Sequence, residues 1–163
     1  MIRIGILSDT HGRLLPKIKE FLCETDEIWH AGDIGSAEIL TELQKLKPLR
    51  AVYGNIDGTS VRSLFPEKLV FEVEKLKVFM THIGGYPGKY HPQSKKIIEL
   101  ERPGLFICGH SHILKVIYDK KYFLLHVNPG AAGTYGLHRS VTAIRLKIEG
   151  KEMKDLEVLD IPR

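Results

Sequence analysis

Apolar runs of strand length recur along the chain, and each run ends abruptly at a side chain with a nitrogen or oxygen ligand atom. The first run, Ile4–Leu7, ends before Asp9 and His11, and the second, Ile28–Gly32, ends at Asp33. An apolar run that stops at such residues is typical of a buried strand that positions a site at its carboxyl end. The residues at the ends of the five runs are Asp9, His11, Asp33, Asn55, His82, His110 and His112.

The first third of the chain alternates between strand and helix patterns. Apolar residues recur at helical spacing after the first and second runs, with Pro16 near the start of one helix and Ser36 as the expected cap of the other. We expect strands over Ile2–Leu7, Glu27–Ala31 and Leu49–Tyr53, with helices over Leu14–Leu22 and from Ser36 to near Pro48. This order predicts an α/β fold with a parallel, helix-covered sheet.

The rest of the chain is richer in strands. Alternating residues predict a hairpin over Leu69–Val73 and Leu76–Met80, and the Gly- and Pro-containing segment Gly84–Pro92 is predicted to be a surface loop. The remaining expected elements are a helix over Gln93–Glu101 and strands over Leu105–Cys108, Leu114–Tyr118, Phe123–Val127, Ser140–Ile148 and Lys151–Val158. No repeat or linker interrupts the pattern, so we expect one domain over residues 1–163.

Composition and charge narrow the class of protein. The chain has 163 residues, 43% hydrophobic and 27% charged, which is typical of a globular protein. Two cysteines and the lack of a signal-type or membrane-spanning segment predict a cytoplasmic location without membrane association. The net charge of +4 comes from lysines interleaved with acidic residues, so we interpret it as a solvated surface and consider nucleic acid an unlikely partner.

The seven polar residues at the ends of the runs indicate a metal centre. They are too many for one tetrahedral zinc ion, and they suit two five- or six-coordinate divalent ions that share a carboxylate. Imidazole, carboxylate and amide together favour Mn, with Ni, Zn, Fe or Co as alternatives, over Ca or Mg. A single Asp-x-His or His-x-His is more often a loop contact than a site, but five such pieces in one chain favour the metal hypothesis.

Five short motifs resemble those of the calcineurin-like metallophosphoesterases, in the same order. They are Asp9-Thr10-His11, Gly32-Asp33, Gly54-Asn55, His82 and Gly109-His110-Ser111-His112. The small size and Asn128-Pro129-Gly130 resemble the compact bacterial and archaeal phosphodiesterase branch. The resemblance implies a four-layer α/β/β/α sandwich of two mixed sheets. It also implies that Asp9, His11 and His112 hold one metal, that Asn55, His82 and His110 hold the other, and that Asp33 bridges both.

One position departs from the family pattern. Many members carry a histidine after the Gly-Asn pair, which protonates the leaving group, whereas this chain has Ile56 followed by Asp57. A positioned general acid contributes roughly 10²–10⁴ in rate when the leaving group needs a proton. We therefore expect a preference for leaving groups that need none. Asp57 is the nearest substitute acid, and a turn or helix-cap role is an equal alternative.

The leading hypothesis is a phosphodiesterase in which two metals activate a bridging hydroxide, with Asp33 and Asn55 as catalytic residues. Its substrate is expected to be a small-molecule phosphodiester or a nucleotide. A binding scaffold is the main alternative, since the retromer scaffold subunit resembles the same fold, and a nuclease is a second one. Exposed strand edges in the hairpin Leu69–Met80 also make a homo-oligomer an open alternative.

Several other residues are weaker candidates. His30 and His126 lie within predicted strands, and we interpret both as hydrogen-bonded core histidines. Cys108 is expected to be a small buried hydrophobic residue. His138 and Arg139 either reach a phosphate or lie on the surface. The segment after His82 is expected to shape the substrate entrance through Tyr86, Lys89, Tyr90 and His91.

Overall fold

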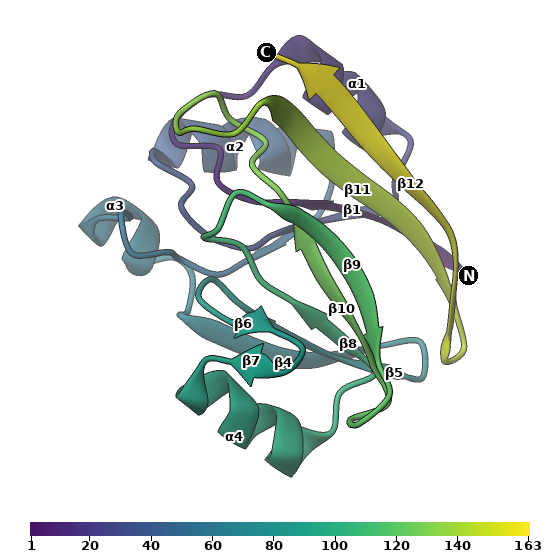
Figure 1. The fold of residues 1–163 in the computed structure, drawn as a ribbon. Helices are drawn as coiled ribbons and strands as arrows, with labels where there is room; N and C mark the ends of the chain where they lie inside the picture. Colours follow the sequence, from purple (N-terminus) through teal and green to yellow (C-terminus); the bar gives the residue numbers. More distant parts are fainter.

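Two mixed five-stranded sheets pack face to face, and helices cover their outer faces, so the fold is the four-layer α/β/β/α sandwich that was expected (Figure 1). The computed structural model describes residues 1–163. Sheet A contains, in spatial order, β12 (Glu152–Pro162), β11 (Ser140–Glu149), β1 (Ile2–Leu7), β2 (Glu27–His30) and β3 (Leu49–Ala51). Sheet B contains β4 (Lys68–Val73), β5 (Leu76–Thr81), β8 (Leu105–Ile107), β10 (Leu124–Pro129) and β9 (Leu114–Asp119).

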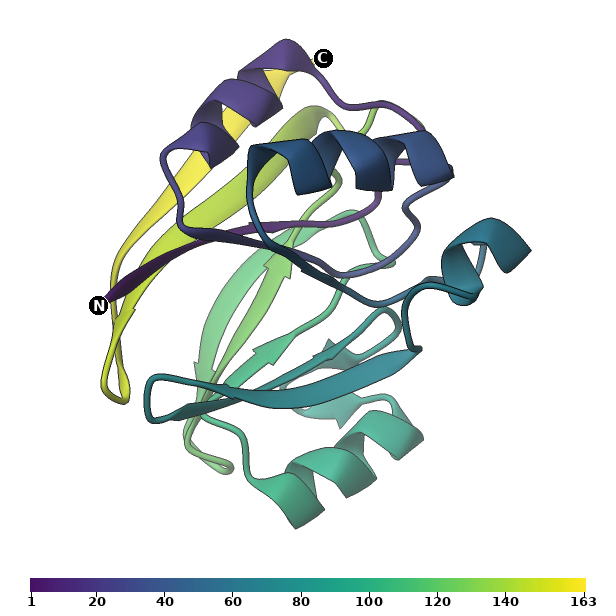
Figure 2. The same ribbon diagram turned by 180° about the vertical axis from the view of Figure 1, so that it is seen from behind.

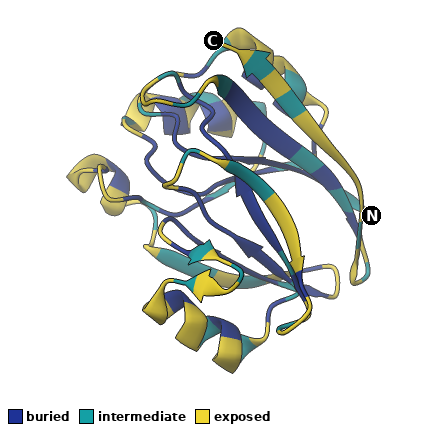
Figure 3. Ribbon diagram, in the orientation of Figure 1, coloured by how far each residue is buried: buried dark blue, intermediate teal, exposed yellow.

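Alternation along the strands divides the apolar residues among three cores. Ile4 and Ile6 of β1 face the layer between the sheets, where they meet Met80 of sheet B. Leu7 faces the opposite way, into the core beneath α1 (Pro16–Cys23) and α2 (Ala37–Leu46). Successive residues of a strand point to opposite faces, so one strand serves both cores. Figure 3 shows the result as buried inner strands and helices that are exposed on their outer sides.

Helices α1 and α2 lie side by side on the outer face of sheet A (Figure 2). Their apolar stripes include Ile18 and Leu22 of α1 and Leu40 of α2, all buried. Pro16 is at the start of α1, as predicted. Ser36 occupies the N-cap position of α2, as predicted, but its side chain makes no cap hydrogen bond.

The outer face of sheet B is covered by α4 (Pro92–Glu101) and by a small hairpin of β6 (Gly85–Tyr86) and β7 (Lys89–Tyr90). This hairpin corrects the predicted loop over Gly84–Pro92. Gly85 and Gly88 have φ angles of +77° and +86°, which lets the chain turn tightly there. The predicted strand over Leu49–Tyr53 ends earlier, at Ala51, and α3 (Thr59–Arg62) was not predicted.

Parallel pairing brings the ligand-bearing ends of the strands together. In sheet A, β1, β2 and β3 run parallel, and in sheet B, β5, β8 and β10 run parallel. The carboxyl ends of parallel strands lie at one edge of their sheet, so the loops after them are neighbours. The two longest helices have ten residues each, and no helix has the length and apolar content to cross a bilayer.

Candidate metal centre

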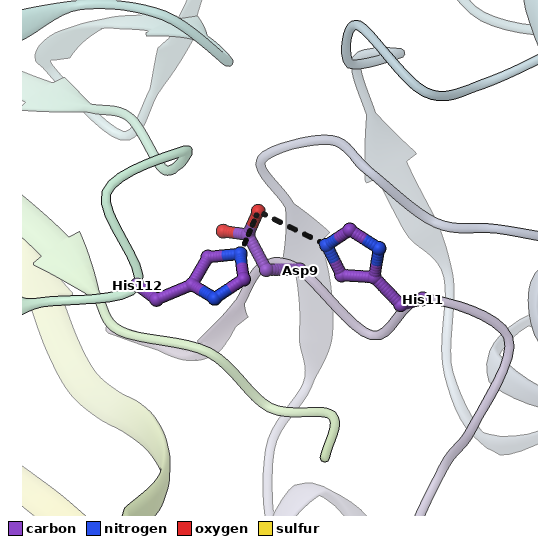
Figure 4. Close-up of side chains that lie close together, drawn as sticks. All are labelled: Asp9, His11 and His112. Atoms are coloured by element: carbon purple, nitrogen blue, oxygen red, sulfur yellow. Dashed lines mark ion pairs between the residues drawn. The ribbon is translucent and has the colours of Figure 1, made fainter. Parts of the chain in front are cut away.

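Asp9, His11 and His112 form the first group of potential ligands (Figure 4). The Asp9 carboxylate is fully buried and lies between the two imidazoles. Its Oδ1 atom is 3.3 Å from His112 Nε2 and 3.8 Å from His11 Nε2. The loop after β1 supplies Asp9 and His11, whereas His112 comes from the loop after β8, about a hundred residues later in the chain.

Asp33, His82 and His110 form the second group. Asp33 Oδ2 is 3.2 Å from His82 Nε2, and both side chains are buried. His110 is more exposed, and its Nδ1 lies 3.1 Å from Asn55 Oδ1. The structure thus brings Asn55 to this group, so all seven predicted residues lie in one site.

The two groups adjoin through Asp33 and His11. His11 Nε2 is 3.6 Å from Asp33 Oδ2, nearly the same distance as from the Asp9 carboxylate of its own group. His82 Nε2 in turn lies 3.8 Å from Asp9 Oδ1. Asp33 is therefore placed where one carboxylate can contact ligands of both groups.

Three buried ligand atoms in this site have no hydrogen-bond partner: Asp9 Oδ1, His11 Nε2 and His82 Nε2. A buried polar atom left without a partner costs about 1–3 kcal/mol, so their convergence needs a compensating interaction. The Nδ1 atom of His82 is 2.8 Å from the Ala31 carbonyl oxygen. A proton on Nδ1 leaves the lone pair of Nε2 free, which is the usual arrangement of a metal-binding histidine. The residues present therefore fit divalent metal ions.

The carboxylates of the site are held in their charged form. Burial opposes ionisation of Asp9, but the imidazoles of His11 and His112 outweigh it and hold its pKa well below the usual range. Burial likewise opposes ionisation of Asp33, while contact with His82 lowers its pKa. Carboxylates bind metal in their ionised form and imidazoles in their neutral form, so the charged carboxylates suit this site to cations.

The backbone of the ligand loops is strained. Five of the nine non-glycine residues with positive φ are in the ligand set: Asp9, His11, Asp33, His110 and His112, with φ between 46° and 72°. Each such residue costs on the order of 1 kcal/mol and persists only where the surroundings impose it. Glycines permit the close approach, since a Cβ at Gly54 would lie 2.1 Å from Asp33 Oδ1. Strain concentrated at one place is typical of a functional site.

Two buried polar side chains brace the ligand loops. The Asp57 carboxylate accepts backbone hydrogen bonds from Ile34, Gly35 and Gly54, at 3.2, 2.9 and 2.8 Å. Of the two roles considered for Asp57, the structure therefore supports the turn. Asn128 braces a ligand loop of sheet B, because its Nδ2 donates a hydrogen bond to the Gly109 carbonyl oxygen at 3.1 Å.

The other buried candidates have different surroundings. His30 is fully buried, lies 3.0 Å from Thr10 Oγ1, and accepts a hydrogen bond from the Gly32 amide, as predicted. His126 is also fully buried, but neither ring nitrogen has a partner, so the prediction that it is hydrogen-bonded is wrong. Cys108 is buried among apolar side chains, as expected.

Residues around the entrance complete the site. His138 packs 5.2 Å from the His112 ring and lies 2.8 Å from the Gly133 carbonyl oxygen, while Arg139 is exposed. Tyr135, which sequence reasoning missed, lies 4.9 Å from the His11 ring. No motif signals this contact, because the two residues are more than a hundred positions apart. The four residues predicted to shape the entrance, Tyr86, Lys89, Tyr90 and His91, line a cavity that also touches His110.

A family model and two named relatives match most of this chain. The family model described as the calcineurin-like phosphoesterase superfamily domain matches residues 2–151. A protein of Methanothermobacter thermautotrophicus named "Probable metallophosphoesterase" is 29% identical over 167 residues, covering 96% of this chain and 91% of that protein. A protein of Methanocaldococcus jannaschii with the same description is 31% identical, covering 78% of this chain and 67% of that protein.

Solved structures share the whole fold. One, described as a novel archaeal phosphodiesterase, is 28% identical with a TM-score of 0.75, covering 97% of this chain and all of that one. Vps29 of Entamoeba histolytica, solved with Zn²⁺, superposes with a TM-score of 0.76 at 15% identity, and the match covers 99% of each chain. The second likeness shows the fold alone.

Proposed function

Because the chain belongs to the calcineurin-like phosphoesterase superfamily, we propose that it is a phosphodiesterase that uses two divalent metal ions. The observation that carries the proposal is the position of Asp33, whose carboxylate lies within 3.6 Å of imidazoles from both ligand groups. In this proposal one ion is held by Asp9, His11 and His112, the other by Asn55, His82 and His110, and Asp33 is shared.

Two ions so held would polarise the phosphate and lower the pKa of a water molecule between them. The protein's own residues provide the charge and the ligand orientation that such a site needs. Asp9 and Asp33 hold negative charge in a buried setting, which binds cations, and the backbone carbonyl of Ala31 orients His82. Asn55 places its amide oxygen beside His110 at the exposed side of the site, where a phosphate ester can enter. Asp33 and Asn55 are therefore the proposed catalytic residues.

In this proposal no residue of the loop that contains Asn55 protonates the leaving group. The position after Asn55 is occupied by Ile56, which is 48% exposed and carries no proton to donate. Asp57 cannot take that role, because backbone amides occupy its carboxylate. Phosphodiesters with acidic leaving groups are thus the preferred substrates. The likeness to the archaeal phosphodiesterase supports diesters over monoesters.

A protein-interaction scaffold is the second candidate, because Vps29 structures match the whole chain. The structure of this chain favours the enzyme, since all seven ligand positions are filled and converge. Mn²⁺ is the proposed metal, with Ni²⁺, Zn²⁺, Fe²⁺ and Co²⁺ as alternatives, because the mixed nitrogen and oxygen ligands suit all of them.

The test is hydrolysis of bis(4-nitrophenyl) phosphate and of 4-nitrophenyl phosphate by chelator-stripped protein titrated with Mn²⁺, Ni²⁺ or Zn²⁺. We expect diester turnover that requires metal and exceeds monoester turnover, and we expect Asn55→Ala to abolish it while the circular dichroism spectrum is unchanged. Absence of turnover with every metal would reject the enzyme and favour the scaffold. Equal activity of the Asn55 variant would reject the site.

A further inference from the structure

Arg62, the last residue of α3, is fixed across the loop that contains Asn55. Its Nε donates a hydrogen bond to the Asp57 carbonyl oxygen at 2.5 Å, and its Nη2 donates one to the Asn55 carbonyl oxygen at 3.4 Å. The guanidinium also lies over the Tyr53 ring, with Cζ 4.5 Å from the ring centre. The two carbonyl groups belong to the residues on either side of Ile56, so the cation spans that position.

The positive charge of Arg62 has no carboxylate partner, since Arg62 forms no ion pair in the structure. Asp57 offers Arg62 its backbone carbonyl, because backbone amides occupy the Asp57 carboxylate. Glu67 lines a cavity together with Arg62, but it does not come within ion-pair distance of the guanidinium. The Nη1 atom of Arg62 makes no hydrogen bond within the chain. Its N–H groups and the charge are therefore available to an anion.

Arg62 and residues of the candidate metal centre line one cavity of about 440 Å³. Asn55 and His82, which lie at the second ligand group, contribute to its wall. Lys68 also lines this cavity, but its Nζ donates a hydrogen bond to Gln93 Oε1 at 2.9 Å. A phosphate ester bound at Asn55 and His82 is thus adjacent to the guanidinium of Arg62.

The proposed reaction leaves negative charge on the departing ester oxygen. Neither Ile56 nor Asp57 supplies a proton to that oxygen, for the reasons given above. A fixed cation with unpaired N–H groups stabilises such charge without transferring a proton, and its effect is largest where charge develops in the transition state. Arg62 has these properties, and it lies at the loop position where many family members carry their proton donor.

We propose that Arg62 is a catalytic residue that binds the departing oxygen of the diester. This rests on the proposed function. A hydroxide derived from water forms a bond to phosphorus, the bond from phosphorus to the ester oxygen breaks, and its electron pair leaves with that oxygen. The guanidinium N–H groups donate hydrogen bonds to the resulting alkoxide or phenolate, which then takes a proton from solvent.

The test compares two diesters that differ in the leaving group alone, methyl 4-nitrophenyl phosphate and methyl phenyl phosphate. Phenolate is the stronger base, so more of its negative charge needs stabilisation by the protein. We expect Arg62→Ala to reduce kcat/KM about tenfold for the 4-nitrophenyl ester and about a hundredfold for the phenyl ester, as for the loss of a hydrogen bond to a charged group.

Arg62→Lys separates the charge from the bracing of the loop. It keeps a cation but loses the planar fork that holds two carbonyl groups. We expect both rates to fall while their ratio stays within about threefold of the ratio in the unchanged protein. Arg50→Ala is the matched control, because Arg50 also lies over an aromatic ring, 4.6 Å from the centre of Phe71, but does not line the cavity. It should change neither the rates nor the ratio.

A role in bracing alone predicts a different pattern. If Arg62→Ala lowers kcat/KM for both esters by the same factor, or if the alanine and lysine variants give the same ratio, Arg62 does not bind the departing oxygen. Circular dichroism of each variant shows whether the fold is retained.

Binding of inorganic phosphate separates this inference from the proposed function. An oxygen of phosphate can take the place of the departing oxygen, and calorimetric titration into protein equilibrated with Zn²⁺ needs no turnover. We expect Arg62→Ala to weaken phosphate binding about tenfold and Arg50→Ala to leave it unchanged. Should no ester be hydrolysed with any metal, the proposed function fails, and this titration still decides the role of Arg62. No phosphate binding by the unchanged protein, or equal binding by the Arg62 variant, overturns the assignment.

Discussion

The two sheets contribute different chemistry to the same site. Sheet A supplies every candidate oxygen ligand, from Asp9, Asp33 and Asn55, together with the imidazole of His11, whereas the candidate ligands from sheet B are all histidines. Each ligand group draws on both sheets, since Asp9 and His11 meet His112, and Asp33 meets His82 and His110. Neither sheet could therefore hold a metal pair alone. The packing between the sheets is part of the site, and changes on the two sides should have unequal effects.

The largest effect is expected from the oxygen side. Asp33→Ala removes the carboxylate that adjoins both groups, and we expect metal-dependent diester turnover to fall on the order of 10³-fold or more. Metal content, measured by elemental analysis after dialysis, should fall below two ions per chain. Asp155→Asn, at an exposed carboxylate of β12, is the matched control and should retain both properties. Full activity of the Asp33 variant would refute the shared-ligand assignment.

Removing one imidazole from each group should have a smaller effect. His110→Ala and His112→Ala each leave the carboxylate of their group in place, so we expect turnover to fall about 10²-fold in both. Each variant should keep one tightly bound metal ion per chain, and the double variant none. Metal titration followed by calorimetry measures this. Two retained ions in either single variant would mean that the histidine is not a ligand.

The two bracing side chains offer a third comparison. Asp57→Ala leaves three backbone amides of sheet A loops without an acceptor, and we expect a loss on the order of 3 kcal/mol in unfolding free energy. Asn128→Ala also removes three hydrogen bonds, in sheet B, but they involve a neutral amide and not a carboxylate, so it should cost less, about 2 kcal/mol. Urea denaturation measures both. A smaller loss for Asp57→Ala than for Asn128→Ala would contradict the comparison.

The smallest effect concerns one buried histidine in each sheet, His30 and His126. Burial is the main reason that the pKa of each histidine falls to about 4 in the folded protein, from about 6.5 in the unfolded chain. Below pH 6.5 the unfolded chain binds protons that the folded histidines exclude, so stability falls as pH drops from 6.5 towards 4. Between pH 6.5 and 5 the loss should be about 2 kcal/mol per histidine. His126→Phe should make the unfolding free energy, measured by urea denaturation, fall less steeply between pH 6.5 and 5. An unchanged pH dependence would count against the burial of a neutral ring.

The parts of this molecule that follow local rules could be predicted from the sequence. The apolar runs identified the strands of both sheets, because alternation and buried parallel strands leave a local pattern. The seven candidate ligand residues, which the structure brings together, were identified because their spacing resembles a family motif. By contrast, α3 has four residues, too few for helical periodicity to show. The β6–β7 hairpin was hidden because its glycines and proline are equally typical of loops.

The parts that were missed depend on contacts between distant residues. The partners of Asp57 include Ile34 and Gly35, more than twenty positions earlier, so nothing near Asp57 indicates its role. The unpaired state of His126 is likewise a property of the packed sheet. From the sequence it resembles His30, which has two partners. Hydrogen-bond partners of buried polar residues are decided by tertiary structure, and sequence alone does not specify them.

The order of the strands has a consequence for how the protein is made. Strand β1 lies between β2 and β11, so sheet A is incomplete until residues 140–149 have been synthesised. The amide of His110 reaches across 101 positions to the Asp9 carboxylate. A ribosome must therefore translate most of the chain before the site can form. Each candidate ligand group includes a histidine from the loop after β8, so neither group is complete before residue 112 has been synthesised.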